Sequence, residues 1–155
     1  MNAHRPAWYP EFLDAVSAHL AAEEDNPILT AWTIGHEILR CQTSPGWSSR
    51  TILRLSADLK ARFPTRKGLS PRNLRYMRAF AQAWPHKAFA QGPLAQLPWH
   101  HHLLLIQKLD DLNLRLRYAR LSLENNWTHT TLKSQINAHP HHHKPTRRPG
   151  ATRLP

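Results

Sequence analysis

The sequence has almost no valine and few residues that favour β-strands. Its 155 residues include one valine and six isoleucines, against 22 leucines and 18 alanines. Strands favour β-branched side chains, whereas helices favour leucine and alanine. This composition argues against a β-sandwich or a parallel α/β sheet. It predicts an all-α fold in the form of a compact multi-helix domain.

Cysteine is nearly absent as well, since Cys41 is the only one. A single cysteine excludes an internal disulfide and any metal site built from several thiolates. Twelve histidines are present, many of them in two runs at 100–102 and 139–143. Neighbouring histidines on a helix point in different directions, and the second run lacks the fixed spacing of a structural zinc site. The sequence therefore predicts no cofactor and no metal.

Long apolar runs are missing too. The uninterrupted aliphatic run over residues 103–106 is only four residues long, whereas a membrane-spanning helix needs about 20. The first ten residues lack the apolar core of a secretory signal. We therefore expect a cytoplasmic protein that has no membrane partner.

Acidic residues do not occur anywhere between Leu59 and Leu109, although the chain contains ten and has a net charge of +11. Residues 50–78 hold nine lysines and arginines and a single acid, Asp58, whereas residues 1–49 carry six acids and two arginines. A compact basic block beside an acidic stretch favours a polyanionic partner and indicates nucleic acid. The alternative is a solvated basic face that has no partner.

Apolar periodicity predicts a series of amphipathic helices separated by turn signals. The expected ranges are about 11–24, 27–41, 49–63, 71–84, 99–109, 111–125 and a shorter one to 137. Asn26 and Ser70 each precede a proline, which is a start signal for a helix, and Ser48 and Thr128 are further N-caps. The stretch 85–98 is predicted to be looser.

The composition changes at His139. The remaining residues contain four prolines and one leucine, so they have little apolar surface to bury and cannot maintain a helix. The predicted organisation is a helical domain over residues 8–138, followed by a disordered basic tail over residues 139–155.

Tryptophan is frequent, with six in the chain. Trp32, Trp84, Trp99 and Trp127 lie on predicted helix faces or at helix ends beside apolar residues, which favours core packing over base stacking. Trp47 is expected to close the helix that begins after Ser48 onto the rest of the domain.

The predicted helix 71–84 separates its side chains into two faces. One face is apolar and consists of Leu74, Met77, Phe80, Ala81 and Trp84. The opposite face carries Arg72, Arg75, Tyr76, Arg78 and Gln82, with Asn73 at the boundary. Arginine can clamp a phosphate or read guanine, and asparagine or glutamine can read adenine. We expect this polar face to be the main contact with nucleic acid, most specifically with double-stranded DNA.

Further cations precede this helix. Arg50 and Arg54 lie one turn apart and are expected to hold the flanking DNA backbone, and Arg66 and Lys67 add charge in the link. The helix pair resembles a helix-turn-helix, although the link over 64–70 is longer than the turn of the standard motif. A control set of cations is Arg115, Arg117 and Arg120 on a later helix.

No catalytic constellation is recognisable. PD-(D/E)XK nucleases need an (Asp/Glu)-x-Lys triplet on a strand, and the only such triplet here is Asp58-Leu59-Lys60, in the middle of a predicted helix. No Ser/His/Asp, Cys/His or glycine-rich phosphate motif is present in a convincing form. The sequence therefore predicts a protein that is not an enzyme.

A series of ordered motifs resembles a known family. They are Trp32-x-Ile34-Gly35-x-x-Ile38, Gly46-Trp47, Ile52-x-x-Leu55-x-x-Asp58-Leu59, Phe63-Pro64, Gly68-Leu69-Ser70-x-Arg72-Asn73-Leu74-x-x-Met77-Arg78-x-Phe80, Ala95-Gln96-Leu97-Pro98-Trp99-x-His101, Arg115-x-x-Tyr118-Ala119 and Trp127-x-x-x-x-Leu132-x-x-Gln135-Ile136. Over about residues 28–137 the chain is similar to the N-terminal domain of the YhcG-type PD-(D/E)XK nucleases of bacteria. The resemblance implies a helical module that engages DNA.

The chain also departs from this family. Members usually continue into a second domain that carries the nuclease carboxylates, and this chain is expected to stop where that domain would begin. Ser48, Leu69 and Pro71 stand where glycine, phenylalanine and a basic residue are common. The resemblance thus implies a non-catalytic DNA-binding module, whose further partner is a nuclease domain or a second copy of itself. The alternatives are a protein-interaction or dimerisation module with an acidic partner, or a truncated remnant of a nuclease.

Overall fold

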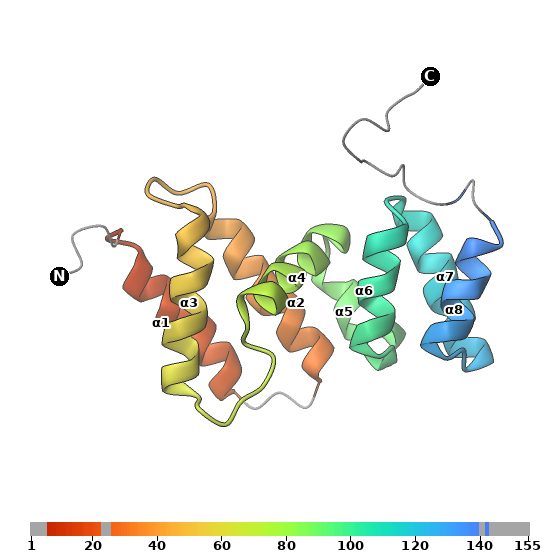
Figure 1. Cartoon of the computed structure of the whole chain (residues 1–155), viewed down its shortest axis with the longest axis horizontal. Helices are drawn as coiled ribbons and strands as arrows, with labels where there is room; N and C mark the ends of the chain where they lie inside the picture. Colours follow the sequence, from red (N-terminus) through yellow and green to blue (C-terminus); the bar gives the residue numbers. More distant parts are fainter. Residues whose placement is uncertain (1–5, 23–25, 140–141, 143–155) are drawn as a thin grey trace, which may run out of the picture. The chain divides into compact units, whose positions relative to one another are not determined.

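The computed structural model of the protein describes residues 6–22, 26–139 and 142. These residues form helices and no strand, which confirms the predicted all-α fold (Figure 1). The elements are α1 (Tyr9–Ala21), α2 (Pro27–Cys41), α3 (Ser49–Arg62), α4 (Pro71–Ala83), α5 (Lys87–Gln91), the 3-10 helix η1 (Pro93–Gln96), α6 (Trp99–Lys108), α7 (Leu112–Asn125) and α8 (His129–Asn137).

Four of these helices begin at the side-chain caps that the sequence predicted. The Asn26 side-chain oxygen accepts hydrogen bonds from the backbone N–H groups of Ile28 and Leu29, at 2.8 and 3.1 Å. Ser48, Ser70 and Thr128 likewise cap α3, α4 and α8. These bonds satisfy donors that a helix start leaves without an intrahelical partner.

The helices themselves differ most from the sequence prediction at two places. Helix α1 begins at Tyr9 rather than near residue 11, because Pro10 lies in its first turn, where proline needs no hydrogen-bond donor. The stretch 85–98 holds α5 and η1, of five and four residues. Elements this short complete barely one turn, so they leave no readable apolar period.

The described elements belong to two compact units, residues 1–98 and residues 99–155. In the first unit α2 lies at the centre and contacts α1, α4, α5 and η1, and α3 packs against both α1 and α4. Figure 1 shows α1 and α3 side by side in this unit. In the second unit α6, α7 and α8 pack against one another in pairs.

Helix α4 packs more extensively on α2 than on α3. Gly35 lies at this crossing, and a Cβ atom built there would be only 2.0 Å from the backbone oxygen of Met77. A glycine is therefore required for the two backbones to approach so closely. At the end of α4 the Trp32 indole N–H donates to the Trp84 carbonyl at 2.6 Å. Helix α2 thus holds α4 at two points.

The tryptophans follow the prediction in part. Trp32 and Trp84 are buried, at 5% and 0% exposure, whereas Trp99 and Trp127 are only half-buried. Trp47 stacks on Trp8 with ring centroids 6.0 Å apart. It therefore closes the start of α3 onto the start of α1.

The second unit buries several polar side chains. The His101 imidazole Nε2 is 2.8 Å from the Trp127 carbonyl oxygen, and Arg115 is only 7% exposed. The Arg115 guanidinium donates to the Leu109 carbonyl at 3.1 Å and thereby closes the turn between α6 and α7. Burial lowers the pKa of Arg115, although nearby Asp110 and Asp111 oppose this effect. The use of Arg115 as a surface control was therefore wrong.

Most of the predicted disordered tail, residues 140–141 and 143–155, lies outside the described residues. Among the residues that are described, no helix combines the length and the apolar character needed to cross a bilayer.

Candidate nucleic-acid interface

Helix α4 has the two faces that the sequence predicted. Its apolar residues Leu74, Met77, Phe80 and Ala81 are all buried, with exposures between 0% and 8%. The Ser70 hydroxyl accepts from the Asn73 backbone N–H at 3.1 Å, and Pro71 occupies the first position of the helix. Burial of one face fixes the rotation of α4, so the opposite face is held toward solvent.

The solvent-facing side carries the predicted cations. Arg72, Arg75 and Gln82 are exposed, and Arg78 is half-buried. Within the described part of the chain, neither Arg75 nor Arg78 forms a side-chain hydrogen bond or an ion pair. Their guanidinium groups are therefore available to an external anion.

Arg72 differs from the other two arginines because it has a neighbour on the same helix. Its Nε–H donates to the Tyr76 hydroxyl at 3.2 Å, and its Cζ atom lies 5.6 Å from the centre of the Tyr76 ring. Tyr76 itself is half-buried. The spacing of four residues is the one that brings side chains on a helix together.

Asn73 has a local role in the structure. Its side-chain amide donates to the Gly68 carbonyl at 2.8 Å. Gly68 has a positive φ of 84°, a conformation that glycine adopts without strain. The Asn73 side chain therefore stabilises the loop before α4, whereas the sequence had placed it at the edge of the binding face.

The four cations that were predicted to flank α4 differ in their surroundings. Arg50 and Lys67 are exposed. The other two contact α1, because Arg54 lies over the Tyr9 ring at 5.8 Å and Arg66 donates to the Leu20 carbonyl at 3.1 Å. Arg54 and Arg66 are thus tied to α1, although Arg66 is exposed like Arg50 and Lys67.

Asp58, the only acid of the basic block, accepts a hydrogen bond from the hydroxyl of the buried Tyr9 at 2.6 Å. The ion pairs found among the described residues all lie on α1, α2 and α3, and they join His19 and Arg40 to Glu37 and Arg62 to Asp14. None of these carboxylates neutralises the arginines on α4.

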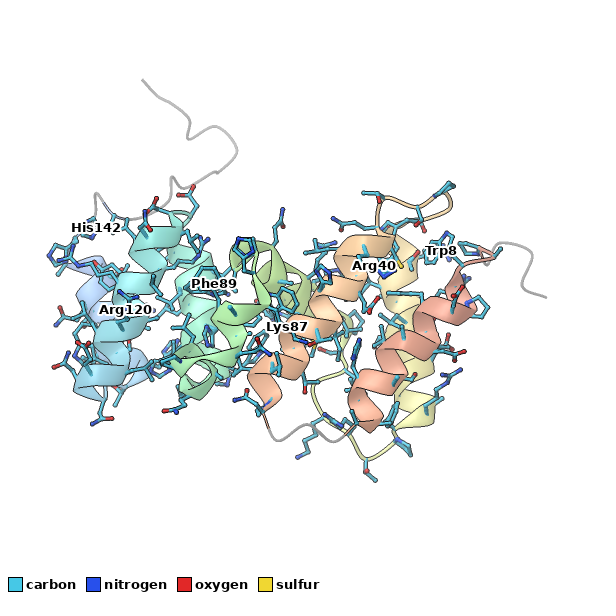
Figure 2. All side chains as sticks on the ribbon, turned by 180° about the vertical axis from the view of Figure 1, so that it is seen from behind. Trp8, Arg40, Lys87, Phe89, Arg120 and His142 are labelled. Carbon is cyan, nitrogen blue, oxygen red and sulfur yellow. The ribbon has the colours of Figure 1, made fainter. Side chains whose placement is uncertain are left out.

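A hollow of about 300 Å³ lies elsewhere in the first unit, between α1 and the end of α2. It is lined by Trp8, Glu11, Phe12, Ala15, Glu37, Arg40, Cys41 and Ser44, and Figure 2 shows Trp8 and Arg40 at this end. Burial raises the pKa of the Cys41 thiol, which outweighs the opposite effect of the Arg40 guanidinium. Across the described residues, no three His, Cys, Asp or Glu side chains gather in a way that could hold a metal ion.

Three features of the site region were not found in the sequence. They are the support of Arg72 by Tyr76, the hydrogen bond from Tyr9 to Asp58 and the close helix crossing at Gly35. Only the first has a sequence signal, which is the spacing of four residues on one helix. The other two join residues from different helices and depend on the tertiary fold.

Taken together, the fold and this surface define an all-helical module in which a basic helix face is held outward by a buried apolar one. The DUF1016 N-terminal domain matches residues 7–143, which is most of the chain. The chain therefore belongs to this family, the N-terminal domain of the YhcG-type proteins, as its motifs had suggested. No curated protein and no solved structure matches the chain.

Proposed function

We propose that this chain is a DNA-binding module and that the outward face of α4 is its main contact with duplex DNA. The observation that carries the proposal is the row formed by Arg72, Arg75 and Arg78, which has no carboxylate partner among the described residues. At a rise of about 1.5 Å per residue this row is roughly 9 Å long. That length spans a few successive phosphates or base edges.

The surrounding charge supports the same proposal. No acid occurs in the sequence between residues 59 and 109, and Asp58 is engaged by Tyr9. An ordinary solvated helix face mixes charges of both signs, and this one does not. Exposed Arg50 and Lys67 add two positive charges before α4.

Duplex DNA is favoured over double-stranded RNA because the cations lie on a helix. The major groove of B-form DNA admits an α-helix, whereas the deep and narrow major groove of A-form RNA does not. Helix α4 is 13 residues long and is buried on only one side, so its polar face is free to enter a groove.

The test is a titration with duplex DNA at about 50 and 200 mM salt, over which the affinity of a protein that binds several phosphates falls by orders of magnitude. Changing Arg72, Arg75 and Arg78 together to alanine should weaken binding strongly. The slope of log affinity against log salt should fall by about one unit for each phosphate that the variant no longer binds. Circular dichroism should be unchanged, because these side chains are outside the buried face.

The matched control changes Arg117, Arg120 and Lys133 to alanine. All three are exposed, lie on α7 and α8, and remove the same charge. This variant should keep most of its affinity. If both triple variants bind DNA equally weakly, or both bind as tightly as the wild-type protein, α4 is not the DNA contact and a protein-interaction module becomes the better explanation.

A further inference from the structure

We infer that Arg72 and Tyr76 act as one guanine-reading unit on α4, while Arg75 and Arg78 contact phosphates without reading sequence. This inference rests on the proposed DNA contact and assigns different roles to its three arginines. It follows from a difference between Arg72, which is hydrogen-bonded to a neighbouring side chain, and the other two arginines, which form no side-chain hydrogen bond in the described structure.

Tyr76 restrains Arg72 in two ways. Its hydroxyl accepts from the Arg72 Nε–H at 3.2 Å, and its ring lies 5.6 Å from the Arg72 Cζ atom. The hydrogen bond fixes the edge of the guanidinium, and the ring contact attracts the cation. Because Tyr76 is half-buried, it is itself less mobile than a fully exposed side chain.

The restraint leaves the useful part of the guanidinium free. Arginine has five N–H donors in a planar fork, and the bond to Tyr76 uses the one on Nε. The donors on the two Nη atoms remain, and they can bond the O6 and N7 acceptors of guanine together. A side chain held in place before binding loses less conformational freedom when it binds.

The other polar residues of α4 do not offer the same arrangement. The Asn73 amide is engaged with the Gly68 carbonyl, so it is not directed to a base. Arg75 and Arg78 form no side-chain hydrogen bond or ion pair in the described part of the chain, so neither guanidinium is oriented toward a base, and phosphate contacts carry no sequence information. One guanine position is therefore expected within an otherwise sequence-independent contact.

The experiment selects binding sites from a pool of duplexes with a randomised centre and then measures affinities for the selected duplex. The wild-type protein should enrich guanine at one position. Replacing that guanine by adenine should weaken binding by roughly 5- to 150-fold, the range of one bidentate contact. Arg72→Lys keeps the charge and Tyr76→Phe keeps the ring, so both variants should retain the salt slope but lose most of this preference.

Arg75→Ala is the matched control. It should lower affinity for every duplex and reduce the salt slope by about one unit, with the guanine preference intact. An undiminished preference in both Arg72→Lys and Tyr76→Phe would overturn the inference. So would an absence of enrichment in a wild-type protein that still binds DNA through α4, which leaves the proposed function standing. An absence of DNA binding at low salt would overturn both.

Discussion

Asp58, the one carboxylate of the basic block, is tied into the fold. Asp58 is the single acid among ten charged residues of the block 50–78, and the buried Tyr9 donates a 2.6 Å hydrogen bond to it. This distance is at the short end of the range for hydrogen bonds between two oxygens. Asp58 therefore joins α3 to α1 through this bond.

A second residue, Arg115, shows that a cation can be structural. We expect Arg115→Ala to lower the free energy of unfolding by about 1–3 kcal/mol, because the buried Leu109 carbonyl loses its guanidinium donor. Urea denaturation followed by circular dichroism measures the change. Arg117→Ala, two positions along and exposed, is the control and should change stability by less than about 0.5 kcal/mol. Equal effects of the two substitutions would show that Arg115 has no special role.

At the scale of helices, the crossing of α2 and α4 sets where the basic face lies. We expect Gly35→Ala to destabilise the first unit by about 1–3 kcal/mol or more, because its Cβ would meet the Met77 carbonyl oxygen at 2.0 Å. Thermal unfolding followed by circular dichroism measures the loss.

Gly92→Ala provides the comparison for this helix crossing. A Cβ at position 92 would have its nearest neighbour at 3.8 Å, and the φ of Gly92 is −88°, which any residue can adopt. This substitution should leave the melting temperature almost unchanged, or raise it slightly by restricting the unfolded chain. A melting temperature lowered equally by both substitutions would contradict the requirement for glycine at the crossing.

The sequence predicted the helices better than it predicted their contacts. Caps such as Asn26 and Ser70 and the apolar period of α4 are local signals, and the structure confirms them. Local signals do not say which helices meet. The pairing of α3 with α4 was expected from their adjacency, whereas the most extensive contact of α4 is with α2, 30 or more residues earlier.

For the candidate site, too, the sequence predicted the arrangement of residues along one helix but not their contacts with other helices. The row Arg72, Arg75, Arg78 follows from helical spacing, and the structure places it opposite the buried face. The contacts of Arg54 and Arg66 with α1 could not be read from the sequence, because they join residues more than 40 positions apart. Charge alone therefore overestimated how many cations remain free.

For the molecule as a whole, charge is separated along the chain. Six acids lie in residues 1–49, whereas residues 50–78 hold nine cations. Such a separation directs a polyanion toward one part of a surface and keeps it from another. This distribution of charge bears on where a ligand binds, and it gives no indication of catalytic activity.

We accordingly expect no nuclease activity from this chain alone. The expected result is intact plasmid DNA after incubation with the purified protein and Mg²⁺ or Mn²⁺. The expectation comes from the sequence, in which the (Asp/Glu)-x-Lys triplet Asp58-Leu59-Lys60 lies within α3 and not on a strand. Cleavage that persists through successive purification steps and stays proportional to this protein would contradict the expectation.

The close approach at Gly35 also limits how this sequence can vary among its descendants. The atom that a side chain at position 35 would strike is a main-chain oxygen, at residue 77. Every amino acid carries that oxygen, so no exchange at 77 can make room for a larger residue at 35. A second substitution at residue 77 therefore cannot compensate for a side chain at position 35. Such a side chain fits only if the two helices move apart along the length over which they pack.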